Sequence, residues 1–212
     1  MDSKILARAS VYILCIKVVA YKLWENKKIE NIMYTSTYDS IIGSLLLAAD
    51  DIGLVGLWLN SDRFYANLLA NRECIAKETP ILQAAKRWLD IYFSGHEPKV
   101  EVPFHLIGTP FRQEVWKLLL QIPYGQVVTY GDLARKMTEK KGIAHMSAQA
   151  IGGAVGHNEI SIVIPCHRVI GANGNLTGYA GGIEKKIKLL ELEGIDTKKL
   201  FLPKTRAKVH AQ

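Results

Sequence analysis

Apolar and polar positions divide the chain into a first half of short strands and a second half of helices. Alternation of β-favouring residues with turn residues predicts three antiparallel strands, Tyr34–Tyr38, Leu45–Ala49 and Leu54–Leu59. Pro80 then opens a run with helical spacing, which predicts a helix at Ile81–Phe93. The apolar face of this helix carries Leu82, Ala85, Trp88, Leu89 and Tyr92. We expect a small α/β unit that ends near residue 105.

The second half predicts four helices, at Phe111–Leu120, Tyr130–Met137, Ala148–Val155 and Ile183–Leu192. Thr129 and Ser147 stand where helix N-caps are expected. The second and third of these helices are typical of a helix-turn-helix, although Thr138–Met146 is longer than the usual tight turn. An ordinary helical pair therefore remains an alternative. In the fourth helix, we expect three lysines to be exposed: Lys185, Lys186 and Lys188.

The helix predicted at Ala148–Val155 has one nearly bare face. Small residues make up this face: Ala148, Ala150, Gly152, Gly153 and Ala154. Each glycine destabilises an isolated helix by about 1 kcal/mol relative to alanine. We therefore expect another surface to approach closely, either a neighbouring helix or a nucleic-acid groove.

Composition and charge narrow the class of protein. The 212 residues are 49% hydrophobic and 22% charged, which is typical of a globular protein and excludes a disordered one. Three cysteines exclude a disulfide scaffold, lack the spacing of a structural zinc site, and fit a reducing cytoplasm. All of the net charge of +7 comes from residues 106–212, which favours a polyanionic partner. The alternative is a solvated basic face with a basic tail at 201–212.

Residues 1–32 differ from the rest of the chain. Their apolar run, Val11–Tyr21, is interrupted by Lys17 and is shorter than the ~20 residues that span a bilayer, so we expect no membrane association. We predict that the natural chain begins at Met33 and that 1–32 are an extension. The alternative is an amphipathic helix packed on the body, and N-terminal sequencing of the native protein distinguishes the two.

A possible nucleophile follows the strand-like run Ile160–Ile164. There Pro165, Cys166, His167 and Arg168 are adjacent, and an imidazole near a thiol can take its proton. Adjacent residues on an extended strand point to opposite faces. The pair therefore needs a turn, which Pro165 favours, or a bridging water. A buried structural cysteine is the alternative.

Other residues near this cluster and elsewhere give further expectations. Small residues at Gly178–Gly182 leave room for a flat ligand. Glu193 ends a helix, where a carboxylate opposes the dipole, so we expect it to have another partner, naturally a histidine. Cys15 and Cys74 lack such neighbours and are expected to be structural.

Residues 33–200 resemble the methylated-DNA–protein-cysteine methyltransferases, also called O6-alkylguanine-DNA alkyltransferases. The most specific motif is Ile-Pro-Cys-His-Arg-Val at 164–169. Further matching positions are Phe111–Tyr130, Gly152, Gly153, Asn158, Thr177–Gly182 and Leu192–Gly194. The resemblance implies an α+β fold, with a small ribonuclease H-like α/β N-terminal domain at 33–105 and a helical domain with a helix-turn-helix at 106–200.

The resemblance also implies a reaction. A cytoplasmic monomer without a cofactor or metal would bind double-stranded DNA from the minor groove and rotate an O6-alkylguanine out of the stack. The alkyl group would pass irreversibly to Cys166, once per molecule, and O4-methylthymine would react less efficiently. This activity is that of a methylated-DNA–protein-cysteine S-methyltransferase.

By the same resemblance, five residues are expected to be catalytic. His167, through a water, would deprotonate Cys166, and Glu193 would hold the imidazole in the required tautomer. Asn158 would order the turn around the cysteine. Tyr130 would donate its hydroxyl to the guanine ring as O6 departs.

Other residues would bind the base or the duplex. The backbone of Val169 would contact the guanine edge, Tyr179 would wall the pocket, and Ala180 would offer only a backbone N–H where some members have serine. The DNA-binding set is Ala148, Gln149, Gly152, Gly153 and Arg168, with Arg168 expected to brace the fold or the loop and not to touch the base. Many members carry arginine in place of Gln149, so weaker DNA binding or extrusion is expected.

Three other functions remain open at this point. A non-catalytic binder of alkyl lesions would lack the nucleophile, whereas this chain has Cys166. A cysteine hydrolase would turn over repeatedly, and a transcription factor would bind DNA without reacting.

Overall fold

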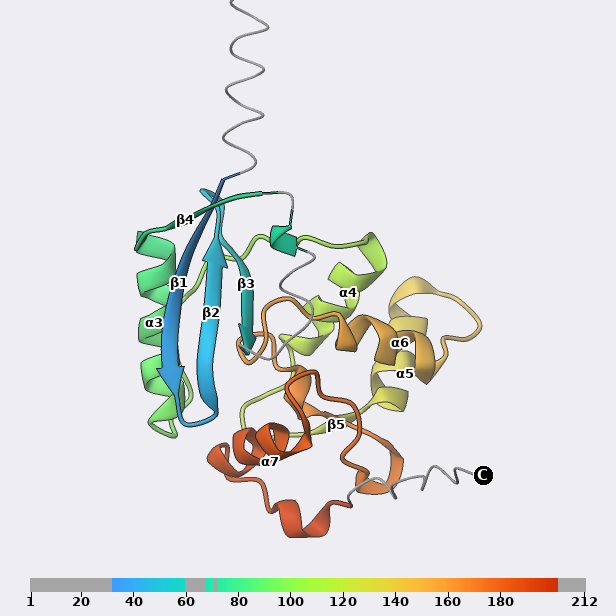
Figure 1. Ribbon diagram of the computed structural model, residues 1–212. Helices are drawn as coiled ribbons and strands as arrows, with labels where there is room; N and C mark the ends of the chain where they lie inside the picture. Colours follow the sequence, from blue (N-terminus) through green and yellow to red (C-terminus); the bar gives the residue numbers. More distant parts are fainter. Residues whose placement is uncertain (1–31, 60–67, 71, 202–212) are drawn as a thin grey trace, which may run out of the picture.

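The computed structural model describes residues 32–59, 68–70 and 72–201 (Figure 1). Its first part is a four-stranded sheet in the order β3-β2-β1-β4. The strands are β1 Ile32–Ser40, β2 Gly43–Ala49, β3 Leu54–Leu59 and β4 Glu73–Ala76. β2 is antiparallel to both β1 and β3, which confirms the three predicted strands, whereas β4 was not predicted and lies parallel to β1.

Helix α3, Pro80–Phe93, covers one face of this sheet (Figure 1). The Thr79 hydroxyl caps it by accepting from the backbone N–H of Leu82, and Pro80 occupies the first turn, where its missing N–H costs nothing. The helix prediction is confirmed. The buried face of α3 consists of Leu82, Ala84, Ala85, Leu89 and Tyr92.

The second part is mainly helical, as predicted. Its helices are α4 Pro110–Leu119, α5 Tyr130–Lys141, α6 Ala148–Gly156 and α7 Ile183–Leu192. Short strands β5, Val128–Thr129, and β6, Val169–Ile170, pair in parallel. Helices α5 and α6 pack together, and α5 runs beyond the predicted end at Met137, so the connection shortens to residues 142–147. Both predicted caps are present, Thr129 in a capping box with Asp132 and Ser147 at α6.

The segment 160–164 is not the extended strand that its apolar run predicted. Only isolated bridges form there, and the chain reverses at Ile162, whose φ is +70°. The backbone N–H of Val163 donates to Ser161 O at 2.8 Å, which closes the turn. Burial of the whole run explains its apolar composition, since a buried turn excludes water as a strand does.

Strand β3 joins the two parts of the molecule through its outer edge. Near its start, Leu54 exchanges hydrogen bonds with the segment 103–105. Near its end, Leu57 N donates to Glu159 O at 2.8 Å, and Ser161 N donates to Leu57 O at 2.9 Å. The turn before Cys166 is therefore fixed to the N-terminal sheet.

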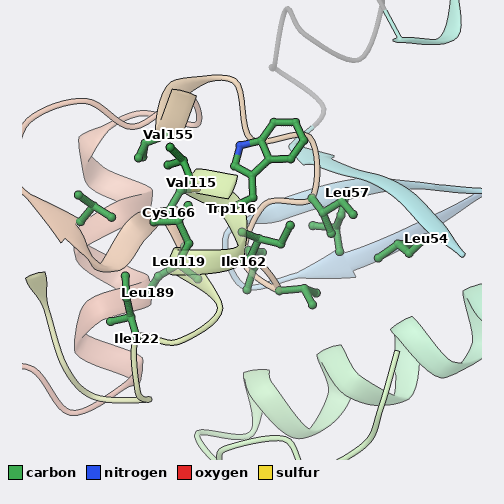
Figure 2. Packing of buried hydrophobic residues seen from close by; sticks show 14 of the residues in the cluster. Leu54, Leu57, Val115, Trp116, Leu119, Ile122, Val155, Ile162, Cys166 and Leu189 are labelled. Atoms are coloured by element: carbon green, nitrogen blue, oxygen red, sulfur yellow. The ribbon is translucent and has the colours of Figure 1, made fainter. Parts of the chain in front are cut away.

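One large core spans both parts. Figure 2 shows Cys166 beside Val115 and Leu119, with Leu57 and Ile162 nearby in the same cluster. All of these apolar side chains are fully buried. The 7% exposed Cys166 thus lies at the edge of a packed interior.

The structure corrects two predictions, one for Cys74 and one for Lys186. Cys74 is exposed on β4, so it is not a buried structural residue. Lys186 is fully buried, not exposed, because its amine finds carbonyl partners inside the protein. Cys15, the apolar run Val11–Tyr21 and the tail from residue 202 lie outside the described residues. Within the described residues, no helix has the length and apolar character needed to cross a membrane.

Candidate active site

The candidate nucleophile lies in a single turn of 3-10 helix, Cys166–Arg168. Arg168 N donates to Pro165 O at 3.0 Å, and Val169 N donates to Cys166 O. The chain therefore turns after the proline, as predicted. Because of this turn, the side chains of Cys166 and His167 are not forced to opposite faces as they would be on a strand.

A buried ion-pair network begins with the two residues that follow the cysteine. His167 Nε2 is 2.6 Å from Glu193 Oε1, which confirms the expectation that a histidine partners this carboxylate. Arg168 Nε donates to Oε2 at 2.8 Å, and Gly125 N donates to the same oxygen at 3.1 Å. Burial alone would raise the pKa of Glu193, but the hydrogen bonds and charges of His167 and Arg168 outweigh it and lower the pKa to about 2. Glu193 is therefore an ionised acceptor.

The ionised carboxylate defines the state of the histidine. Burial lowers the pKa of His167 below its ordinary value, although Glu193 opposes the shift, so the ring is neutral near pH 7. The hydrogen-bond network places the ring proton on Nε2. Nδ1 is buried and has no hydrogen-bond partner in the part of the chain that the structure describes. Nδ1 is therefore the atom that can accept a proton from a neighbouring thiol.

Arg168 belongs to this internal network, so its place among the predicted DNA-binding residues is corrected. It is 8% exposed, and Nη1 donates to Ile122 O at 2.7 Å while Nε and Nη2 hold Glu193. A guanidinium with these partners has little left to offer a phosphate. Bracing the loop is the role that its contacts fit.

Asn158 holds the turn that precedes the cysteine. Its Nδ2 donates to Ile164 O at 2.8 Å, and its Oδ1 accepts from Ile160 N at 3.1 Å. Both partners are backbone groups in a buried loop, where a lost partner costs about 1–3 kcal/mol. Asn158 thus stabilises the reversal at 160–164.

Tyr130 begins α5 and lies close to the sulfur. Burial, and then the nearby charge of Cys166, raise the pKa of Tyr130 to about 12, so its hydroxyl keeps its proton. The hydroxyl donates weakly to Thr177 O and Gly178 O, each at 3.4 Å, and is available for a better acceptor. Gly178 has a φ of +64°, and a Cβ there would lie 3.0 Å from the Tyr130 oxygen, so only glycine fits well.

A pocket of about 780 Å³ opens beside this tyrosine. The residues that connect it to the expected site are Tyr130, Gln149, Gly152, Gly153, Thr177 and Gly178. Gly152 faces Tyr130, whereas a Cβ at Gly153 would meet no protein atom within 4 Å. No described helix therefore covers Gly153. Ala154, which was expected on the same bare face, is instead buried in the core.

Of the remaining expected residues, Ala148 also lines this pocket, and Val169 follows the turn at Cys166–Arg168. Ala148, Gln149 and Ala180 are exposed, and Tyr179 is half-buried. The Val169 carbonyl, expected at the base edge, accepts from Lys186 Nζ at 2.5 Å. Within the described residues, no group of His, Cys, Asp and Glu could hold a metal ion.

Sequence reasoning missed two residues of the site. Lys186 Nζ also donates to Thr177 O at 3.1 Å, and burial lowers its pKa to about 8. Its spacing from Leu189, Leu190 and Glu193 follows one helix face, which could have indicated burial. Tyr92 was assigned only to the apolar face of its helix, but its hydroxyl donates to Glu193 Oε1 at 2.8 Å.

Comparison with known proteins identifies the family to which the chain belongs. Residues 33–106 match the ribonuclease-like domain, and residues 110–195 the DNA binding domain, of 6-O-methylguanine DNA methyltransferase. The chain belongs to this methyltransferase family. The predicted family and the two-part α+β fold class are thereby confirmed.

Individual members of the family resemble the chain over most of its length. A methylated-DNA–protein-cysteine methyltransferase of Methanosarcina acetivorans is 38% identical over 168 residues, covering 76% of this chain and 99% of the relative. One of Mycobacterium bovis is 42% identical over 157 residues, covering 74% and 90%. The crystal structure of Mycobacterium tuberculosis OGT in complex with DNA is 39% identical with a TM-score of 0.64, covering 80% of this chain and 99% of that one.

Proposed function

We propose that the protein repairs O6-alkylguanine in double-stranded DNA by transferring the alkyl group to Cys166, irreversibly and once per molecule. The family match supports the reaction class. The observation that carries the assignment of residues is the buried His167–Glu193 pair, at 2.6 Å, whose histidine follows Cys166 in the same turn. O4-methylthymine is a poorer substrate in this proposal.

The chemistry is a displacement at carbon. The Cys166 proton passes to His167 Nδ1, directly or through water, and Glu193 stabilises the charge that develops on the ring. The sulfur attacks the alkyl carbon, the S–C bond forms, and the C–O6 bond breaks with its electron pair moving to the base. The base takes up one proton, so a thiol and an O6-alkylguanine become a thioether and guanine.

The base is proposed to enter beside Tyr130. Its hydroxyl keeps its proton and makes only long hydrogen bonds here, so it can donate to the guanine ring as negative charge develops. Tyr179 would wall the pocket, while the Ala180 N–H and the Val169 backbone would contact the base edge. For Val169, this requires that the carbonyl share its second lone pair, since Lys186 uses the first.

The duplex is proposed to lie on α6. Ala148, Gln149 and Gly153 are exposed on this helix, and Gly152 lines the pocket. The glycines allow close approach of the groove, and the excess positive charge of residues 106–212 favours phosphates. We further propose that the chain consists of two domains, at 33–105 and 106–200. We also propose that the protein acts as a monomer in the cytoplasm, a compartment in which cysteine thiols stay reduced.

The test uses duplex DNA with a labelled O6-methyl group on one guanine. The full chain should take up one equivalent of label on the Cys166 peptide, and Cys166→Ala should take up none while binding the duplex with unchanged affinity. Cys74→Ala is the matched control and should react normally. Repeated turnover would instead show a hydrolase, and binding without transfer would show a non-catalytic lesion binder or a transcription factor.

A further inference from the structure

One hydroxyl from the N-terminal layer enters the network behind the cysteine. Tyr92, on α3, is fully buried. Its hydroxyl donates to Glu193 Oε1 at 2.8 Å and lies 3.2 Å from His167 Nε2. Tyr92 is 75 residues from His167 and 101 from Glu193 in sequence, so this contact depends on the packing of both parts of the fold.

The hydroxyl acts as a donor to the carboxylate. Burial, and then the Glu193 carboxylate, raise the pKa of Tyr92 well above its ordinary value, so the phenol keeps its proton. With that proton given to Glu193, a lone pair of the Tyr92 oxygen remains for the Nε2–H of His167. The imidazole N–H thus faces two oxygens, and the opposite tautomer would present a bare nitrogen lone pair to Glu193 Oε1.

Aromatic packing fixes the position of the hydroxyl. The Tyr92 ring stacks on Trp88 with centroids 5.3 Å apart, and it meets Phe93 edge-on at 5.4 Å. The rings of Tyr124 and His167 also meet it edge-on, with centroids 6.1 and 6.2 Å away. Because α3 lies against the sheet, the hydroxyl has little freedom to follow a moving carboxylate.

We propose that Tyr92 is a positioning residue, through which α3 orients Glu193 and fixes the Nε2–H tautomer of His167 for proton transfer from Cys166. The proposal rests on the proposed function, because it concerns the same nucleophile. Tyr92 touches neither the substrate nor the reacting sulfur in this scheme and acts through the carboxylate and the imidazole.

Removal of the hydroxyl has a defined effect on pH dependence. Glu193 would lose one donor and become more basic, so it would stabilise the charged imidazole more strongly and raise the pKa of His167. The Nε2–H would also lose the Tyr92 oxygen as an acceptor, which lowers this pKa, but that contact is 3.2 Å long whereas the bond to the carboxylate is 2.8 Å, so the effect through Glu193 is the larger. The rate of alkyl transfer would then begin to fall at a higher pH as the solution is made more acidic. The charged and titratable groups that act on His167 or Tyr92 are Glu193, Arg168, Lys186 and Tyr179. Tyr124 lies near Glu193, and Cys166 lies near Lys186.

The experiment compares Tyr92→Phe with the wild-type full chain in single-turnover transfer from O6-methylguanine duplex DNA between about pH 5 and pH 9. We expect a rate about tenfold lower at neutral pH, as for loss of one hydrogen bond to a charged group. The acid limb should shift upward by about half a pH unit, and DNA affinity should not change. Tyr38→Phe is the matched control, because it removes a hydroxyl bonded at 2.9 Å to Asp90 on the same helix.

A second readout, which needs no DNA, makes each outcome decisive. Reaction of Cys166 with iodoacetamide across the same pH range, followed on the Cys166 peptide, should show the same acid-limb shift without DNA. If the wild type transfers no label, the proposed function fails, and the iodoacetamide profile still tests Tyr92. An unshifted acid limb in Tyr92→Phe, whether the rate is normal or merely reduced by a lower melting temperature, would overturn the positioning role.

Discussion

Replacement of Glu193 by glutamine tests the buried network most directly. The carboxylate side chain is fully buried, and Arg168 and His167 both bond to it. Glutamine has almost the same shape but no charge, and its NH₂ group cannot accept a hydrogen bond. Arg168 would keep its charge in the interior and lose the one carboxylate that it contacts within the described residues.

Two routes give a similar magnitude for the loss of stability. Lowering the pKa of Glu193 from 4.5 to about 2 corresponds to about 3 kcal/mol at neutral pH, since each unit is worth about 1.4 kcal/mol. Breaking one side of a buried ion pair costs about 3–5 kcal/mol. Because the folded-state pKa is depressed, this stability is present above pH 4.5 and is lost as the pH falls toward 2.

Urea unfolding of the full chain at neutral and acid pH measures the effect. Glu191→Gln is the matched control, because Glu191 is an exposed carboxylate on the same helix and should change stability by no more than about 0.5 kcal/mol. Glu193→Gln combined with Arg168→Met should recover part of the loss, since the buried guanidinium that lost its carboxylate partner is then removed as well. A loss in Glu193→Gln no larger than in Glu191→Gln, or unchanged acid sensitivity, would refute the reasoning.

Three more predictions concern DNA and the turn. Gly153→Ala should stabilise the fold by about 1 kcal/mol and raise the melting temperature by about 2–4 °C, because α6 gains helix propensity without a clash. The same substitution should weaken DNA binding in a titration, and unchanged binding would contradict close approach of the groove to α6. Gln149→Arg should tighten DNA binding and steepen its salt dependence by about one phosphate contact. An unaltered salt slope would argue against contact between residue 149 and the duplex. Asn158→Ala should cost about 1–3 kcal/mol in urea unfolding and slow alkyl transfer, because two buried backbone groups lose their partner; full stability would show that the turn holds itself.

Local sequence patterns predicted most of the secondary structure. Period-two and helical spacing, together with Thr129 and Ser147 as caps, located three strands and the helices close to their observed positions. The four-residue β4 was missed because all of its side chains are exposed, so no apolar pattern marks it. The strand predicted at 160–164 was wrong because the apolar composition of this run reflects its burial in a turn and not pairing in a sheet.

The candidate site was predictable only where its residues are adjacent in sequence or match a motif. The Cys166 motif and a histidine partner for Glu193 followed from the sequence. The roles of Tyr92 and Lys186 did not follow from the sequence. In each case the polar end of the side chain, a hydroxyl or an amine, reaches its partner from an otherwise apolar and buried helix face. For Arg168 the expected bracing role fits its contacts with Glu193 and Ile122, although the same residue had also been grouped with the DNA-binding set.

The edge of β3 has a consequence for the order in which a new chain becomes competent. Leu57 pairs with a segment about one hundred positions later, and such distant pairings form slowly. Synthesis must also pass Glu193 before the carboxylate exists at all. The thiol on a nascent or half-folded polypeptide therefore lacks its activating partners, and its reactivity depends on the completed fold.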